Sequence, residues 1–205
     1  MTQETGVLTQ DEVDALLGQC NTRTPTGARN YALLQLVAQT GIRCGEALAV
    51  TRSMIGEEEW GGRRLWVLRL PRRATKGQRP RDPIPLTPAT VTALQRWQEK
   101  RAKLVGNGGP LFCTVSKGQA AGFGEGELCP GQPLDGRYVR SLVARLAAKA
   151  GIGRRVHPHM LRHTCLTQLY DRTRNLRLVQ EVAGHSSSRH TERYTHIHPV
   201  AVAEG

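Results

Sequence analysis

The chain has 205 residues, a formal net charge of +12 at pH 7 and 39% hydrophobic residues. This length suffices for one domain with a sizeable core and leaves little room for two. No apolar run approaches the length of a membrane span, and residues 1–4 lack the basic and apolar regions of a secretion signal, so a cytoplasmic protein without a membrane partner is expected. Five scattered cysteines without a C-x-x-C pair favour reduced thiols over a disulfide framework or a zinc ribbon.

Basic residues are concentrated in two stretches of the chain. Residues 63–81 contain eight Arg or Lys, residues 137–170 contain seven, and neither stretch contains an acid. A surface that serves only solubility intersperses both signs of charge, so these stretches favour a nucleic-acid partner. Composition does not separate DNA from RNA, or an enzyme from a binding protein.

Local signals predict where the first helix begins and ends. Thr9 and Glu12 have the spacing of a capping box, which predicts a helix to about Cys20 after a loose polar lead-in over residues 1–8. Residues 21–27 are rich in turn-forming residues and predict a loop.

The next helix, through Tyr31 and Ala38, is apolar on most of its circumference and is therefore expected to be buried. It ends at Gly41, which suits a left-handed cap. Arg43 and Glu46, three residues apart, begin a short apolar helix. They form either a surface ion pair or the rim of a cleft, and this segment alone does not decide between the two.

The middle of the chain contains a predicted sheet. Residues 65–70 predict a strand, residues 71–81 a basic turn with Lys76 at its tip, and residues 83–86 an edge strand limited by two prolines. A lysine at such a tip is ordinarily a contact to a phosphate backbone.

Helices are predicted for most of the remaining chain. Pro88, preceded by the capping residue Thr87, begins a helix to about Leu104. Residues 106–131 are Gly-rich and irregular, without a nucleotide-binding fingerprint. Further helices are predicted from Asp135 to about Ala150, from Pro158 to about Tyr170, and over residues 175–183 before Gly184. The expected fold class is mainly α with a small antiparallel β-sheet (α+β).

The closely spaced reactive residues lie between His157 and Tyr194. His159 and His163 suit a zinc pair, but Met160 occupies the general-base position of H-E-x-x-H and no acid stands out as a third ligand, so no metal is expected. A serine hydrolase is disfavoured because G-x-S-x-G is missing. Metal-free phosphoryl transfer fits better, because two arginines can hold a phosphodiester while a hydroxyl attacks and His or Lys moves protons.

Three motifs, in this order and spacing, resemble those of the tyrosine recombinases of the phage integrase family, in particular the Xer-like members. They are residues 40–48 (Thr-Gly-Ile-Arg-Cys-Gly-Glu-Ala-Leu), 159–163 (His-Met-Leu-Arg-His) and 184–187 (Gly-His-Ser-Ser), the last followed by Tyr194. The resemblance extends from Leu8 to Tyr194 and implies the fold of a tyrosine-recombinase catalytic domain.

The resemblance also implies a chemistry, namely site-specific DNA recombination for integration, excision or resolution. Tyr194 would attack the scissile phosphate, forming a 3′-phosphotyrosyl link and freeing a 5′-hydroxyl. No cofactor and no metal is implied, because the phosphotyrosine conserves the bond energy. Six further residues receive roles by the same resemblance: the phosphate clamps Arg43 and Arg162, the proton-transfer residue His159, the phosphate hydrogen-bond donor His185, the leaving-group acid Lys76, and Glu46, which orients Arg43.

The expected partner is double-stranded DNA in the nucleoid. The resemblance implies chains that are monomers in solution and form a tetramer that exchanges strands through a Holliday junction. Eight basic residues are expected to contact DNA outside the reaction centre: Arg72, Arg73, Arg79, Arg81, Arg137, Arg140, Arg154 and Arg155.

Residues 1–205 are expected to form a single catalytic domain, with residues 195–205 as a C-terminal tail. The N-terminal DNA-clamping domain usual in the family is expected to be absent, which predicts weak and salt-sensitive DNA binding. Two alternatives share the fold: relaxation of supercoils by a type IB topoisomerase-like enzyme, and DNA binding without catalysis.

Overall fold

The computed structural model describes residues 6–74, 82–115, 118–119 and 127–184, and helices dominate this part. The helices are α1 (Gln10–Gly18), α2 (Pro25–Thr40), α3 (Cys44–Leu48), α4 (Pro88–Val105), α5 (Gly136–Lys149), α6 (Pro158–Thr173) and α7 (Leu176–Ala183), with the 3-10 turns η1 (Arg52–Met54) and η2 (Arg72–Ala74). The strands are β1 (Ile55–Trp60), β2 (Arg63–Leu68), β3 (Ile84–Pro85), β4 (Gly118–Gln119) and β5 (Glu127–Leu128). The expected class, mainly α with a small antiparallel sheet, is confirmed.

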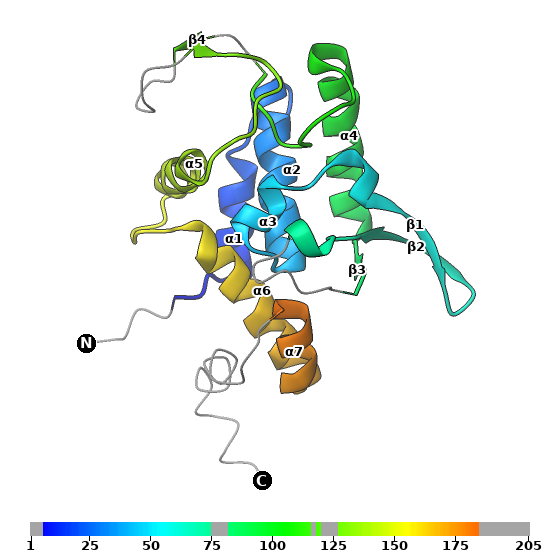
Figure 1. The fold of residues 1–205 in the computed structure, drawn as a ribbon. Coiled ribbons are helices and arrows are strands. Elements are labelled where there is room, and N and C mark those ends of the chain that lie inside the picture. The colour runs from blue at the N-terminus through cyan, green and yellow to red at the C-terminus, as the bar shows by residue number, and fades with distance from the viewer. Residues whose placement is uncertain (1–5, 75–81, 116–117, 120–126, 185–205) are drawn as a thin grey trace.

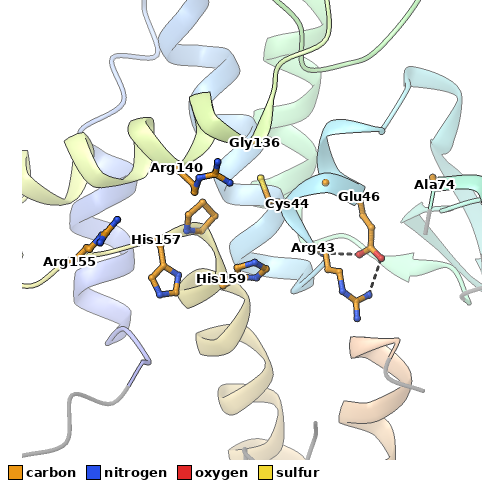
Figure 2. Close-up of a pocket in the computed structure, with 11 residues that line it drawn as sticks. Arg43, Cys44, Glu46, Ala74, Gly136, Arg140, Arg155, His157 and His159 are labelled. Atoms are coloured by element: carbon orange, nitrogen blue, oxygen red, sulfur yellow. Dashed lines mark hydrogen bonds and ion pairs between the residues drawn. The ribbon is translucent and has the colours of Figure 1, made fainter. Parts of the chain in front are cut away.

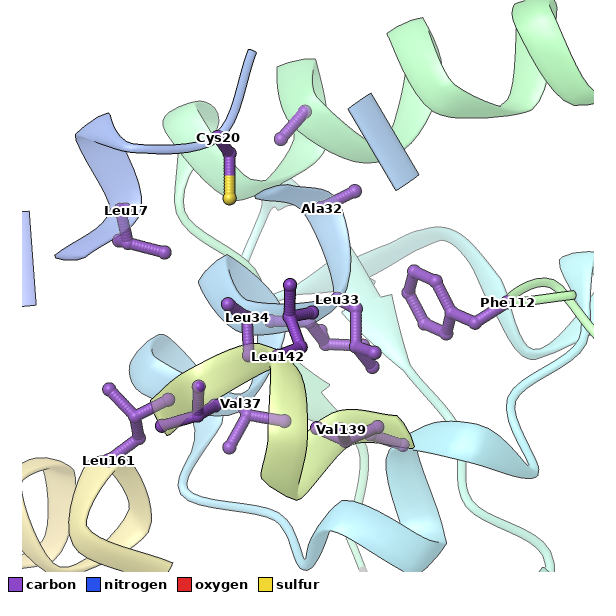
Figure 3. Packing of buried hydrophobic residues seen from close by; sticks show 14 of the residues in the cluster. Leu17, Cys20, Ala32, Leu33, Leu34, Val37, Phe112, Val139, Leu142 and Leu161 are labelled. Carbon is purple, nitrogen blue, oxygen red and sulfur yellow. The ribbon is translucent and has the colours of Figure 1, made fainter. Parts of the chain in front are cut away.

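Helix α2 is the centre of the fold (Figure 1), where it packs against α1, α3, α4 and α6. Its apolar side chains are buried on most sides, as the sequence predicted. Leu33, Leu34 and Val37 share one core cluster with Leu142 of α5 and Leu161 of α6 (Figure 3). The cleft described below is built on helices that pack around this core.

The helix starts follow local capping chemistry. The Thr9 hydroxyl accepts a hydrogen bond from the Glu12 backbone N–H at 3.1 Å, and the Glu12 carboxylate accepts one from the Thr9 N–H at 2.9 Å, so the predicted capping box is confirmed. The predicted loop over residues 21–27 is wrong in its second half, because α2 already begins at Pro25. The cause is Thr24, whose hydroxyl caps the first turn, with a proline following it at the first helical position.

Glycines end two of the helices, as predicted. Gly41 has φ 63° at the end of α2, and Gly184 has φ 60° at the end of α7. A side chain at position 41 would be strained by this backbone conformation, and its Cβ would lie 3.2 Å from the Cys165 sulfur of α6. The close approach places the turn between α2 and α3 against α6.

The larger sheet has the order β1-β2-β3 with antiparallel neighbours. β3 is an edge strand of two residues that includes Pro85, as expected from its prolines. β1, the other outer strand, was not predicted, because residues 55–60 (Ile-Gly-Glu-Glu-Glu-Trp) do not alternate between apolar and polar residues. The strand β1 forms because every one of its residues pairs with β2. This outer strand carries the consecutive glutamates 57–59.

A small apolar cluster separate from the main core joins α6 and α7. It contains Leu166 of α6 with Val179 and Ala183 of α7, all fully buried. The connection between the two helices passes through Arg174, a non-glycine residue with a positive φ of 49°. Helix α7 is therefore attached at the end of the molecule where α6 finishes (Figure 1).

A buried arginine links α2 to α5. Arg29 donates hydrogen bonds to the Tyr138 hydroxyl, to Asn30 Oδ1 and, at 2.9 Å, to the carbonyl oxygen of Cys113. Burial lowers the pKa of the Arg29 guanidinium, while contact with Tyr138 opposes this shift. The network fixes the start of α5, the helix that carries Arg140 to the cleft.

Within the described ranges, no helix is both long and apolar enough to cross a bilayer.

Candidate active site

A cleft of about 770 Å³ opens where α3, α5 and the start of α6 meet (Figure 2). Helix α3 and the first turn of α6 are more than a hundred positions apart in the sequence. The cleft contains Arg43, Glu46, Arg140, Arg155 and His159, all of which the sequence proposed as site residues. The other residues that line it are Cys44, Gly45, Ala74, Gly136, His157 and Pro158.

Arg43 and Glu46 form a partly buried pair at the start of α3. Glu46 Oε2 accepts a hydrogen bond from the Arg43 backbone N–H at 2.7 Å, and Oε1 accepts one from Nη1 at 3.1 Å. The glutamate side chain is 3% exposed and the arginine side chain 24%. This excludes the surface ion pair and establishes the cleft rim as the position of Arg43. Because the buried carboxylate of Glu46 binds both the backbone N–H and the guanidinium of Arg43, the guanidinium has little freedom to rotate.

Arg162 lies in the same region but is more enclosed, at 6% exposed. Its Nη1 donates to the carbonyl oxygen of Gly41 at 2.5 Å, and its Nη2 donates to the carbonyl oxygen of Ala183 at 2.8 Å. The two predicted clamp arginines therefore differ in setting: Arg43 lines the cleft, whereas Arg162 lies between the end of α2 and the end of α7.

Two histidines stand together at the start of α6. His159 and His157 are both exposed, and their ring centres are 6.3 Å apart in an edge-to-face arrangement. The sequence proposed His159 but gave no role to His157. The N-cap position of His157, directly before Pro158, was the available signal, because it places the side chain at the same cleft wall.

The remaining predicted DNA contacts fall into different settings. Arg140 and Arg155 are exposed in the cleft, and Arg72 is exposed on η2. Arg137 is exposed and pairs with Asp135 at 3.2 Å. Arg154 is instead held by Glu12 through two hydrogen bonds of 2.6 Å. These hydrogen bonds lower the pKa of the Glu12 carboxyl.

For the other proposed residues, side-chain settings are not described. Arg73 is described only as part of the η2 backbone. Five residues lie outside the described ranges: Lys76, Arg79, Arg81, His185 and Tyr194. In the described part of the chain, no three His, Cys, Asp or Glu side chains come together as metal ligands would.

Cys44 is a cleft residue that the sequence did not propose. Burial raises the pKa of its thiol to about 11, and the nearby Arg140 opposes this shift. Because only the thiolate is a strong nucleophile, we expect Cys44 to resist alkylation at pH 8, while the exposed Cys129 reacts first. Mass spectrometry of peptides after timed iodoacetamide treatment measures both rates, with the denatured chain as the reference. Equal rates for Cys44 and Cys129 in the folded protein would contradict the enclosed setting of Cys44.

Comparisons with known proteins agree with this geometry. The profile of the Phage integrase family matches residues 6–199. A tyrosine recombinase of Synechococcus elongatus is 33% identical over 194 residues, covering 94% of this chain and 54% of that protein. The tyrosine recombinase XerC of Xylella fastidiosa strain 9a5c is 31% identical, covering 93% of this chain and 56% of that protein. The crystal structure of the site-specific recombinase XerH bound to difH substrate superimposes with a TM-score of 0.73 at 26% identity, covering 98% of this chain and 53% of that one.

The chain belongs to the phage integrase family. Within it, the chain resembles the catalytic domain of Xer tyrosine recombinases in both sequence and fold. It spans about half the length of the relatives it matches.

Proposed function

We propose that this chain is the catalytic part of a site-specific DNA recombinase that cleaves and rejoins DNA through a tyrosine. The observation that supports this most directly is the basic cleft in a chain of this family. There Arg43 is fixed by the buried Glu46 and shares the cavity with His159, Arg140 and Arg155. A phosphodiester is the ligand that such a set of cationic donors suits best.

In the proposed first step, the phenolic oxygen of Tyr194 attacks the scissile phosphorus. The bond between phosphorus and the 5′ oxygen breaks, the phenolic proton leaves by way of His159, and Lys76 gives a proton to the departing oxygen. The products are a 3′-phosphotyrosyl link and a free 5′-hydroxyl. Attack by a 5′-hydroxyl reverses the step. Since one phosphate diester replaces another, no energy source such as ATP is consumed.

The arginines would supply the electrostatic part of catalysis. Charge accumulates on the non-bridging oxygens as the phosphorus becomes five-coordinate, and a guanidinium already in place stabilises that charge without reorganisation. Glu46 supports this role, because it holds Arg43 in one orientation before DNA arrives. Arg162 and His185 are proposed as the other phosphate contacts.

The proposed partners are double-stranded DNA and further copies of the chain. XerH was crystallised on difH substrate, and a lambda integrase tetramer, which shares the fold, was crystallised on a Holliday junction. By analogy, four copies would act in pairs and pass through such a junction. The place of action would be the bacterial nucleoid. The single-domain organisation over residues 1–205 remains a prediction.

Trapping on a nicked suicide duplex tests the proposal. Once the nick lets the short cleaved end diffuse away, religation stops, and the covalent adduct should accumulate even in EDTA. Peptide mapping should find the DNA on Tyr194. DNA binding without any adduct, or an adduct at another residue, would overturn the proposal. An adduct from a protein that cannot resolve a synthetic four-way junction would favour the topoisomerase-like alternative.

The settings of Arg140 and Arg154 lead to opposite expectations. Arg140→Ala should weaken DNA binding at all sequences and reduce the slope of log affinity against log salt by about one, because one phosphate contact is lost. Arg154→Ala should lower the unfolding temperature with little change in that slope, because its partner is Glu12. Fluorescence anisotropy over a salt series and thermal unfolding of both variants measure the difference. A salt slope that falls equally in both variants would contradict the structural role of Arg154.

A further inference from the structure

The Arg162 side chain lies where the C-terminal ends of two helices meet. Nη1 is bonded to the carbonyl of Gly41, the residue that caps α2, and Nη2 to the carbonyl of Ala183, the last residue of α7. The last carbonyls of a helix have no partner inside it and carry the negative end of the helix dipole. The buried guanidinium at this point therefore satisfies one carbonyl at each end and complements both dipoles.

Helix α7 needs such an attachment. It has eight residues, and a helix this short does not hold its conformation in water without tertiary contacts. Its apolar contact with α6 is the small cluster of Val179 and Ala183 around Leu166, which is separate from the main core. The hydrogen bond from Arg162, which lies one helical turn before Leu166 on α6, adds a polar anchor at the C-terminal end of α7.

The same side chain also holds the turn that precedes the cleft. Gly41 stands two residues before Arg43, whose backbone N–H is bound by Glu46. Arg162 thus joins three parts through one rigid planar group: its own helix α6, the turn before Arg43, and the end of α7 at Ala183.

We infer that Arg162 is a positioning residue for α7 as well as the phosphate ligand that the proposed function makes it. When its guanidinium is in place, the end of α7 is tied through Arg162 to the turn between α2 and α3. DNA that engages Arg162 should stabilise this docking, and docking should strengthen DNA binding by the same factor, because binding couplings are reciprocal. Only these DNA-dependent effects rest on the proposed function.

Hydrogen exchange of the DNA-free protein tests the docking. Arg162→Lys keeps the charge but cannot span both carbonyls, so amides at Val179 and Ala183 should exchange about tenfold faster, as expected when charged hydrogen bonds are lost from a local unit. Arg43→Lys is the matched control, since it alters the other clamp arginine and should leave α7 unchanged. Hydrogen exchange of both variants is measured under conditions in which the amides inside α2 exchange as slowly as they do in the parent protein. Parental exchange of α7 in Arg162→Lys, or equal acceleration in Arg43→Lys, would overturn the inference.

A second variant tests the consequence for catalysis with both arginines present. Val179→Ala removes the apolar anchor of α7 and should accelerate exchange of its amides. It should also slow adduct formation on the suicide duplex by about tenfold, within the range that misplacement remote from the chemistry produces. If the α7 amides of Val179→Ala exchange faster while adduct formation is as fast as in the parent, docking of α7 is not linked to catalysis. If the parent chain forms no adduct at all, the proposed function fails, while the exchange result still decides the docking.

Discussion

Replacing Arg43 with alanine is expected to slow formation of the covalent DNA adduct by about 10²–10³-fold, the usual loss when one preorganised charge donor is removed. The reason is its setting: the guanidinium is at the cleft, partly exposed to a ligand, and bound on its other side to a buried carboxylate. The measurement is a single-turnover time course on the nicked suicide duplex at saturating protein. Tyr194→Phe, which lacks the proposed nucleophile, defines the background.

The companion variant Glu46→Gln distinguishes orientation from direct action. The variant keeps the shape of the side chain but loses the charge that binds the Arg43 guanidinium. A smaller decrease, about tenfold, is therefore expected in the rate of adduct formation. If Glu46 acts only through Arg43, the double variant should be no slower than Arg43→Ala alone, since coupled residues are not additive. An Arg43→Ala rate within tenfold of the parent, or fully additive losses in the double variant, would contradict this scheme.

Replacing Trp97 with alanine is expected to lower the free energy of unfolding by about 3–5 kcal/mol, the range for large aromatic side chains removed from a core. Trp97 of α4 is 0% exposed, and its Nε1–H donates to the carbonyl oxygen of Leu111 at 2.9 Å. The substitution therefore leaves both a cavity and an unsatisfied buried carbonyl. Urea or thermal unfolding followed by circular dichroism measures the change.

Two further variants serve as controls for the Trp97 prediction. Leu104→Ala removes a large apolar side chain from the same helix, but this residue is 46% exposed, so the change should stay within about 0.5 kcal/mol. Trp97→Phe refills most of the cavity while leaving the carbonyl of Leu111 without its donor, and its cost should fall between the other two. Equal stability of Trp97→Ala and Leu104→Ala would show that α4 is not anchored in the way the structure describes.

Signals that act over a few residues were enough to predict most helix ends. The capping box at Thr9, the stop at Gly41 and the start at Pro88 each depend on chemistry within four positions of the boundary, and each is found where it was predicted. β1 was missed because a strand with a glutamate run depends on its neighbour β2 and not on its own pattern.

The site was predictable to the extent that its motifs are local. Arg43 and Glu46 are three residues apart, so the sequence indicated that they could pair, but it left open whether they lie on the surface or at a cleft rim. The ion pair between Glu12 and Arg154 joins residues that are 142 positions apart, and no local pattern could have indicated it. The same applies to the carbonyls bound by Arg162, because they depend on how two helix ends come together.

The outer strand β1 has a consequence for how copies of the protein behave when they are crowded. Among the residues that the structure describes, no strand pairs with the outer edge of β1, and such an edge presents a row of backbone donors and acceptors, the usual template for sheet extension between molecules and for aggregation. Glutamates 57–59 add charge to that edge, although Glu57 pairs with Arg64 and Glu58 with Arg69. Two such edges brought into register would place carboxylates of one copy near those of the other. We therefore expect crowded copies to resist joining through the edges of their sheets.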